Sequence, residues 1–142
     1  MAEEMGATHF INADREDSVK RILEITSVGA DYSFEIVGFP SIVQQAFNSV
    51  RPGGTAVMVA LSPSGSEITV ATGALMADRA LIGASHGAAR PRVDFPWLLD
   101  LYANGRLKLD ELITKYRPLE EINEAFDDLT KGVTARTVLT FD

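Results

Sequence analysis

Few of the side chains that commonly bind metals or perform catalysis occur in this chain, and those present are not grouped. The sequence contains no cysteine and two histidines, His9 and His86. Neither histidine belongs to a His-x-x-x-His or His-Glu pair, and thiolate ligands are absent, so the sequence predicts no zinc site. The Gly-x-Ser-x-Gly motif of serine hydrolases is also missing. We therefore expect neither a metal ligand nor a catalytic residue in this chain.

Two pairs of adjacent carboxylates could in principle act as a general acid and a general base. They are Glu120-Glu121 and Asp127-Asp128. Both pairs fall on the first turn or the polar face of a predicted amphipathic helix, where acidic residues commonly contact solvent. A solvated helix face therefore explains these residues better than a catalytic pair does.

Glycines recur at or near the ends of predicted strands, which is the edge where doubly wound sheets bind ligands. They are Gly38, Gly53, Gly54 and Gly83. No Gly-x-Gly-x-x-Gly motif follows any of these strands, so the sequence does not predict a pyrophosphate cradle at a helix N-terminus. A tight turn between a helix and a strand explains Gly53-Gly54. Taken alone, the pattern indicates half of a ligand-binding α/β domain.

Short apolar, β-prone runs along the chain predict strands. The run at residues 55–61 is apolar on both faces, which is typical of a central parallel strand covered by helices. The predicted strands are residues 8–11, 30–37, 55–61, 80–85 and 136–141.

Segments of helical periodicity separate these strands. The first helix is predicted to be capped by Asn12 or Asp14. The second begins after Pro40 and ends at the break formed by residues 51–54. Alternating strands and helices with right-handed crossovers predict an α/β fold: a doubly wound, Rossmann-like, mostly parallel sheet with helices on both faces. We expect one domain over residues 1–142.

Two further helices are predicted in the second half of the chain. One begins at Asp94, ends at Asn104-Gly105 and turns its apolar side chains inward. These side chains are Phe95, Leu98, Leu99 and Tyr102. The other has Pro118 in its first turn and ends at Gly132. Its apolar face consists of Ile122, Ala125, Phe126 and Leu129.

The composition excludes several classes of partner. A formal net charge of −7 argues against binding to nucleic acid or to anionic lipid. No apolar run approaches the roughly 18 residues that a membrane-spanning helix needs. The first residues show neither the basic nor the apolar region of a signal peptide. We therefore expect a cytoplasmic protein whose partners are small solutes or other proteins.

Five blocks of the sequence, taken together and in order, resemble zinc-dependent alcohol dehydrogenases of the medium-chain dehydrogenase/reductase superfamily. The blocks are residues 5–12, 29–38, 51–59, 105–114 and 118–126. The resemblance covers only the C-terminal part of the family's coenzyme-binding domain. It therefore implies a partial Rossmann-like sheet without the first two strands, the glycine fingerprint or the zinc-bearing catalytic domain. In the complete enzyme, hydride passes between an alcohol and NAD or NADP, and zinc acts as a Lewis acid.

The resemblance also implies cofactor contacts at the ends of two strands. Val37 and Gly38 match the strand end that lines the adenine pocket. Val59, Ala60 and Leu61 match the strand end that faces the nicotinamide. Many relatives have glycine at the position of Ala60.

Three further contacts are implied by the same resemblance. Ala84 and His86 match positions where backbone groups hold the nicotinamide carboxamide, and an exposed loop imidazole is the alternative interpretation of His86. Arg136 matches a basic residue near the pyrophosphate, where a guanidinium suits the dianion; a surface arginine is the alternative. Arg136 favours the alcohol dehydrogenase branch over zinc-free quinone reductases, which show Gly-Lys at this point.

We expect this chain alone to be inactive towards alcohols and to bind the cofactor only at roughly millimolar concentration or more weakly. Two other classes stay open: a stand-alone interaction or weak nucleotide-binding domain, and a fragment of a zinc-free quinone reductase relative. We also expect a homo-oligomer formed through sheet edges. Either residues 8–11 move beside the strand at 32–37, or a second molecule supplies the missing pairing.

Overall fold

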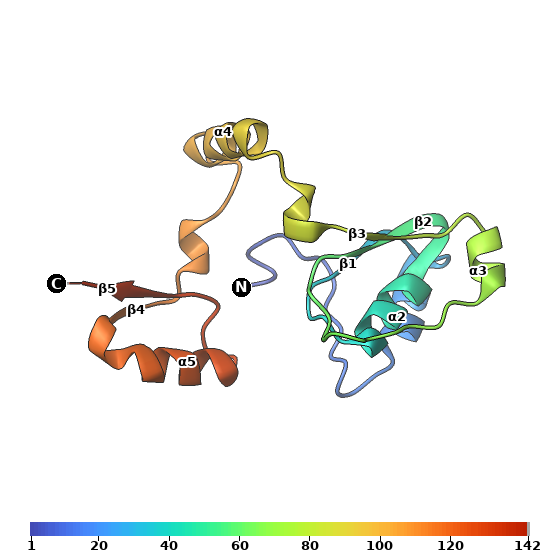
Figure 1. Ribbon diagram of the computed structural model, residues 1–142, viewed down its shortest axis with the longest axis horizontal. Coiled ribbons are helices and arrows are strands. Elements are labelled where there is room, and N and C mark those ends of the chain that lie inside the picture. The colour runs from blue at the N-terminus through green and yellow to red at the C-terminus, as the bar shows by residue number, and fades with distance from the viewer. Residues whose placement is uncertain (142) are drawn as a thin grey trace. The chain divides into compact units, whose positions relative to one another are not determined.

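The computed structural model describes residues 1–141, and Figure 1 traces their path. Contacts within the chain divide it into two compact units, Met1–Ala89 and Arg90–Asp142. Each unit has a parallel β-sheet of its own and is described by itself. The single domain expected over residues 1–142 stays a prediction.

The first unit contains a 3-stranded parallel sheet in the order β1-β2-β3. Its strands are β1 (Ala30–Glu35), β2 (Val50–Met58) and β3 (Ala80–Gly83). Helix α2 (Pro40–Ser49) connects β1 to β2, and α3 (Thr72–Met76) precedes β3 (Figure 1). The expected α/β class, with a mostly parallel sheet flanked by helices, is confirmed. Helix α3 was not predicted.

The core of this unit lies between α2 and β2. Phe47 and Val50 are fully buried, and Ala56 belongs to the same cluster. Val43 precedes Phe47 by one helical turn and is buried as well, because residues four apart share a helix face. Pro40 occupies the first turn of α2, so the second helix predicted at this proline is confirmed.

Helix α1 (Ser18–Thr26) begins later than predicted. Its N-cap is Asp17, whose Oδ1 accepts a hydrogen bond of 3.0 Å from the Lys20 N–H. Asn12 uses its side-chain oxygen instead to accept from the Asp14 N–H at 3.0 Å. This local turn upstream of the helix leaves the capping role to Asp17. The prediction that Asn12 or Asp14 caps the helix is therefore wrong.

Residues 8–11 form no strand, which contradicts the prediction for this run. Among the described residues, β1 is hydrogen-bonded to β2 alone. The expected move of residues 8–11 to a place beside β1 is therefore not observed either. A β-prone run becomes a strand only where a neighbouring strand pairs with its backbone, and this run has no such neighbour in the described part of the chain.

Strand β2 begins at Val50, directly after α2, rather than at Thr55 as predicted. Its pairing with β1 is irregular at this point, because Ala30 faces Val50 while Tyr32 already faces Thr55. Gly53 has a φ of 72°, and a Cβ on Gly54 would lie 2.9 Å from the Ala30 carbonyl oxygen. The two glycines thus permit a bulge inside the strand and do not form a turn before it.

The second unit contains a 2-stranded parallel sheet with a helix between the strands in sequence. Its elements are α4 (Pro91–Ala103), β4 (Lys115–Pro118), α5 (Ile122–Thr130) and β5 (Thr137–Thr140). Short 3-10 helices lie at Ser85–Ala88 in the first unit and at Asp110–Leu112 and Leu119–Glu121 in the second.

Helix α4 begins at Pro91 rather than at Asp94. It ends as predicted, with Asn104 as its C-cap. Its apolar side chains do not face inward, which corrects the prediction: Phe95 is 58% exposed and Leu99 is 64% exposed. Leu98 and Tyr102 are exposed as well. Helical periodicity identifies an apolar face, but it does not show that the same chain covers that face.

Strand β4 was not predicted, and Pro118 is its last residue rather than part of a helix. Proline lacks an N–H, and it is tolerated at the end of a strand in a small sheet. The last helix therefore begins four residues later, at Ile122. The predicted strand at 136–141 is confirmed in its central part as β5.

Asp128 is not on a solvated helix face, which corrects another prediction. Its Oδ2 lies 2.8 Å from Lys115 Nζ and 2.7 Å from Arg117 Nη2, and Arg117 also pairs with Glu121. Hydrogen bonds from Lys115 and Arg117 lower the pKa of Asp128. Asp127, 74% exposed at its side chain, and the exposed Glu120 match the predicted solvent contact.

Candidate functional site

The carboxyl ends of β1, β2 and β3 lie at one edge of the parallel sheet, where ligands bind in doubly wound folds. Seven of the residues implicated by the resemblance follow these strands directly. We refer to them as the strand-end cluster: Val37, Gly38, Val59, Ala60, Leu61, Ala84 and His86. The structure thus brings together residues that are widely separated in the sequence.

Glu35 organises the first two strand ends, and sequence reasoning missed it. It is the last residue of β1 and is 2% exposed. Its Oε1 accepts hydrogen bonds of 2.7 Å from the N–H groups of both Val37 and Gly38. Its main-chain oxygen accepts from Val59 N–H at 2.8 Å and Ala60 N–H at 3.3 Å. The signal in the sequence was a carboxylate near the end of the predicted strand at 30–37, three residues before Gly38.

These hydrogen bonds also explain why the strands end earlier than predicted. The N–H groups of Val37 and Gly38 bind the Glu35 side chain instead of continuing the ladder with β2. Strand β1 therefore ends at Glu35 rather than at residue 37, and β2 ends at Met58 rather than at residue 61. Strand β3 likewise ends at Gly83.

Gly38 brings the first strand end against the second. Its φ is 93°, and a Cβ at this position would lie 2.6 Å from the Leu61 carbonyl oxygen. Only glycine combines this backbone conformation with so close an approach. The main chains of Gly38 and Leu61 are therefore adjacent, as a single binding surface across the two strand ends requires.

The side chains of the strand-end cluster offer apolar contact and little acid-base chemistry. Val37 is 58% exposed and Leu61 is 91% exposed. His86 is the only titratable member of the cluster. Its Nδ1 lies 3.1 Å from the Ser85 hydroxyl, and its φ of 50° places it in the left-handed region. Ala84 is tied to the neighbouring strand through its N–H, which donates to the Met58 carbonyl at 2.9 Å. This arrangement can hold a ligand, but it supplies no nucleophile.

Arg136 lies in the second unit, directly before β5. Its side chain is exposed, while Thr114 holds its main chain. The Thr114 N–H donates to the Arg136 carbonyl at 3.0 Å, and the Arg136 N–H donates to the Thr114 Oγ1 at 3.4 Å. The structure therefore fixes the local backbone at Arg136 within the second unit.

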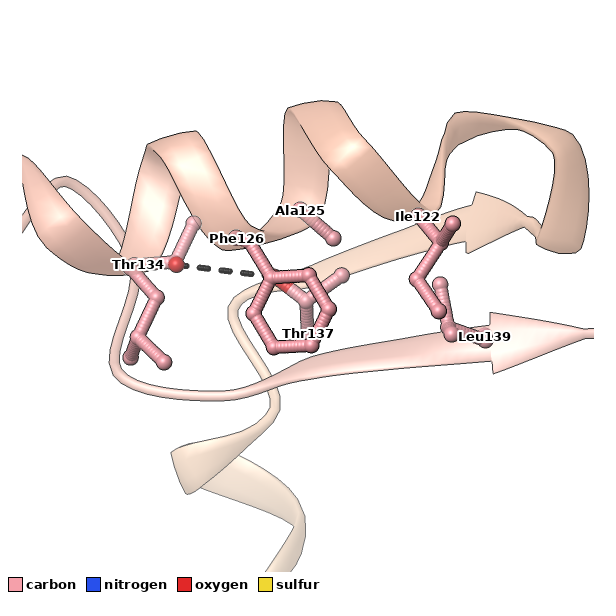
Figure 2. A pocket seen from close by; sticks show the side chains of 7 residues that line it. Ile122, Ala125, Phe126, Thr134, Thr137 and Leu139 are labelled. Carbon is pink, nitrogen blue, oxygen red and sulfur yellow. Dashed lines mark hydrogen bonds between the residues drawn. The ribbon is translucent and has the colours of Figure 1, made fainter.

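A cavity of about 160 Å³ lies between α5 and β5 in the second unit (Figure 2). The apolar face predicted for the last helix forms one wall and is thereby confirmed. Across from it, Thr137 Oγ1 lies 3.5 Å from Thr134 Oγ1. The lining residues are Ile122, Ala125, Phe126, Leu129, Thr134, Thr137 and Leu139. None of them is titratable, so this cavity is an apolar surface without acid-base chemistry.

Comparison with known families identifies the first unit. A family model described as zinc-binding dehydrogenase matches residues 1–104. The chain belongs to the zinc-binding dehydrogenase family. The resemblance to zinc-dependent alcohol dehydrogenases, in their C-terminal part, is therefore confirmed.

Several relatives cover nearly all of this zinc-binding dehydrogenase chain. Alcohol dehydrogenase-like 2 from Arabidopsis thaliana is 34% identical over 100% of the chain and 38% of the relative. S-(hydroxymethyl)glutathione dehydrogenase from Paracoccus denitrificans is 34% identical over 99% of the chain and 40% of the relative. The chain thus spans about two fifths of the length of these relatives.

Solved structures show the same fold. Benzyl alcohol dehydrogenase from Acinetobacter calcoaceticus superposes with a TM-score of 0.92 at 30% identity. The match covers 99% of this chain and 39% of that one. An alcohol dehydrogenase zinc-binding domain protein from Burkholderia ambifaria gives a TM-score of 0.90 at 33% identity, over 99% of this chain and 38% of that one.

The described residues of this zinc-binding dehydrogenase chain do not fit a zinc ion. Within residues 1–141, no group of three or more His, Cys, Asp or Glu side chains is arranged to hold a metal. Asp128 and Glu121 both contact Arg117, a cation of the protein itself. We therefore derive no zinc chemistry from this chain.

No helix in the described residues is long and apolar enough to cross a membrane.

Proposed function

We propose that this chain forms part of the coenzyme-binding region of an oxidoreductase that transfers hydride between NAD or NADP and an alcohol, aldehyde or ketone. The observation that carries the proposal is the convergence of three strand ends at one sheet edge, with Gly38 and Leu61 in close backbone contact. The alcohol dehydrogenase names of the relatives support it.

In this proposal, the strand-end cluster binds and orients the cofactor. Val37 and Gly38 contact the adenine side, and Val59, Ala60 and Leu61 face the nicotinamide. The bound nicotinamide supplies the hydride chemistry. The chain's own contribution is orientation, since a fixed ring position makes hydride transfer effectively intramolecular.

Ala84, His86 and Arg136 complete the proposed contacts. Main-chain groups of Ala84 and His86 hold the carboxamide, and the Arg136 guanidinium approaches the pyrophosphate. The exposed side chain of Arg136 has no ion-pair partner among residues 1–141, which leaves it available for an anionic ligand. A cytoplasmic location and the absence of nucleic-acid partners stay predictions.

The isolated chain should not oxidise alcohols, because no side chains among residues 1–141 are grouped to hold a metal ion and the strand-end cluster consists mainly of apolar residues. The test is to incubate purified chain with excess zinc, with NAD or NADP, and with primary and secondary alcohols, while the absorbance of the reduced cofactor is followed. Turnover above a zinc-only blank would contradict the prediction.

Cofactor binding should nevertheless be detectable. A titration of ¹⁵N-labelled chain with NAD and with NADP should shift the amide signals of the strand-end cluster, with a Kd of roughly millimolar or weaker. Shifts spread evenly over the surface would argue against a site at the strand ends. A Kd in the low micromolar range would contradict the expected weakness.

An interaction role is the second candidate, and the free edge of β1 favours it. Tyr32 and Phe34 on this strand are 65% and 66% exposed, and β1 pairs with β2 alone in the described part of the chain. An unpaired strand edge can hydrogen-bond to another molecule. We expect a homo-oligomer formed through this edge, and sedimentation analysis tests it; a monomer at every concentration would exclude the oligomer.

A further inference from the structure

One buried residue is hydrogen-bonded to both strand ends of the proposed cofactor surface, to the first through its side chain and to the second through its main-chain oxygen. Glu35 accepts four backbone hydrogen bonds, two through Oε1 and two through its main-chain oxygen. The four donors are the N–H groups of Val37, Gly38, Val59 and Ala60. These residues belong to the two segments assigned to the adenine and nicotinamide sides of the cofactor.

We propose that Glu35 is a positioning residue for the cofactor. It does not touch the ligand in this proposal; it fixes the backbone of the turn that follows β1 against the segment that follows β2. The proposal rests on the proposed function, because the surface that Glu35 shapes is the one assigned to the cofactor. Neither the sequence patterns nor the resemblance assigns a role to this residue.

The chemistry of the carboxylate supports this assignment. Both Oε1 contacts measure 2.7 Å, at the short end of the range for N–H···O hydrogen bonds. The second oxygen, Oε2, is buried without a hydrogen-bond partner among residues 1–141. Buried polar atoms are seldom left unpaired, because their desolvation is uncompensated. An apolar residue at this position would leave the Val37 and Gly38 N–H groups without this acceptor, so the buried carboxyl group serves the turn itself.

The test compares three variants of the full chain by NMR. Glu35→Ala removes the side-chain acceptor. Glu35→Gln keeps an oxygen that can accept from the same N–H groups. Ser49→Ala is the matched control, because Ser49 is also buried and hydrogen-bonds to the Ala46 carbonyl at 2.8 Å, yet does not contact the strand ends.

Two quantities are measured for each variant: the exchange rates of the Val37 and Gly38 amide protons, and the initial slope of the signal shifts against NAD concentration. Glu35→Ala should accelerate exchange at both amides and reduce the slope about tenfold. Glu35→Gln should stay within about threefold of the wild type in both quantities, since its amide oxygen can accept hydrogen bonds from the same N–H groups. Ser49→Ala should leave both unchanged.

The outcomes separate this inference from the proposed function. No shifts in the wild-type chain with NAD or NADP would overturn the proposed function, and the role of Glu35 in positioning the cofactor would fail with it. Wild-type binding with an unchanged slope in Glu35→Ala would overturn the role of Glu35 alone. An equal loss in Ser49→Ala would also overturn it, because general destabilisation would then explain the effect. Should Glu35→Ala not fold, Glu35→Asp replaces it, with the same expectation, because its carboxylate is withdrawn by one methylene.

Discussion

The close approach of Gly38 to Leu61 can be tested by adding a single methyl group. Gly38→Ala combines two penalties. The φ of 93° is a conformation that alanine rarely adopts, and the left-handed region costs a non-glycine residue about 1–2 kcal/mol. The new Cβ would also lie 2.6 Å from the Leu61 carbonyl oxygen. Displacing that backbone costs about 1–3 kcal/mol, as in an overpacked core.

Gly65→Ala separates the two penalties. Gly65 has a φ of 80°, and beyond its chain neighbours no atom lies within 4 Å of the place that an alanine methyl would take, so alanine there meets the backbone strain alone. We expect the unfolding free energy to fall by about 1–2 kcal/mol in Gly65→Ala and by about 2–5 kcal/mol in Gly38→Ala.

The assay is urea denaturation followed through amide signals of β1 and β2, which report on the first unit. Cofactor-induced shifts should also be lost in Gly38→Ala and retained in Gly65→Ala, because only Gly38 belongs to the strand-end cluster. Equal destabilisation by the two substitutions would refute the close approach. Retained shifts in Gly38→Ala would refute its importance for binding.

Three further pairs of variants test the rest of the structure. Asp17→Ala should lower the unfolding free energy by about 1 kcal/mol through loss of the α1 cap, whereas Asp14→Ala should change it by less than about 0.5 kcal/mol; urea denaturation followed by far-UV circular dichroism measures both. Phe47→Ala, in the fully buried core, should lower the unfolding free energy by about 3–5 kcal/mol. Phe126→Ala, at a side chain that is 61% exposed, should lower it clearly less in the same assay. Equal losses would contradict the burial of Phe47. Lys115 and Arg117 lower the pKa of Asp128 below its ordinary value of 3.8. The ionised Asp128 therefore stabilises the folded state fully at pH values above 3.8, and this stabilisation is lost as the pH falls through the lowered pKa. Asp128→Asn should therefore destabilise the β4-α5-β5 unit near neutral pH and weaken its acid dependence, while Asp127→Asn should keep that dependence; amide signals recorded during acid titration decide, and identical titrations would contradict the pairing.

The elements that could be predicted from the sequence are those that a local pattern of residues identifies without knowledge of tertiary contacts. Helix α2 begins at Pro40 and has an apolar face that includes Val43 and Phe47, so periodicity and a helix-start signal agree. Residues 55–58 of β2 and 80–83 of β3 belong to apolar runs of the kind that a parallel sheet requires. The helix between β1 and β2 predicts their parallel pairing, whereas the helix between β2 and β3 was not predicted.

The elements that could not be predicted depend on partners distant in the sequence. Residues 8–11 have a β-prone composition, but within residues 1–141 no strand pairs with them. Lys115–Pro118 has two basic residues among four and forms β4 by pairing with β5. Asp128 looked solvated because a helical pattern does not show that Lys115 and Arg117 lie against it. In each case, the deciding contact is tertiary.

The same distinction applies to the candidate site. The resemblance placed the strand-end cluster, and parallel pairing explains how its members converge at one edge. Glu35 escaped prediction because its partners are backbone N–H groups, whose positions no side-chain motif describes.

A site built mainly from backbone also determines which substitutions matter. If the chain contributes orientation and no reacting group, the exposed side chains of Val37 and Leu61 can vary as long as they remain apolar, because cofactor contact there needs area and no particular atom. Gly38 and Glu35 cannot vary in this way, since one permits the approach of two strand ends and the other fixes it. Leu61→Val should therefore retain cofactor-induced shifts that Gly38→Ala loses. Cofactor binding should therefore be more sensitive to substitutions that change the backbone of the turn after β1 than to substitutions of the exposed apolar side chains.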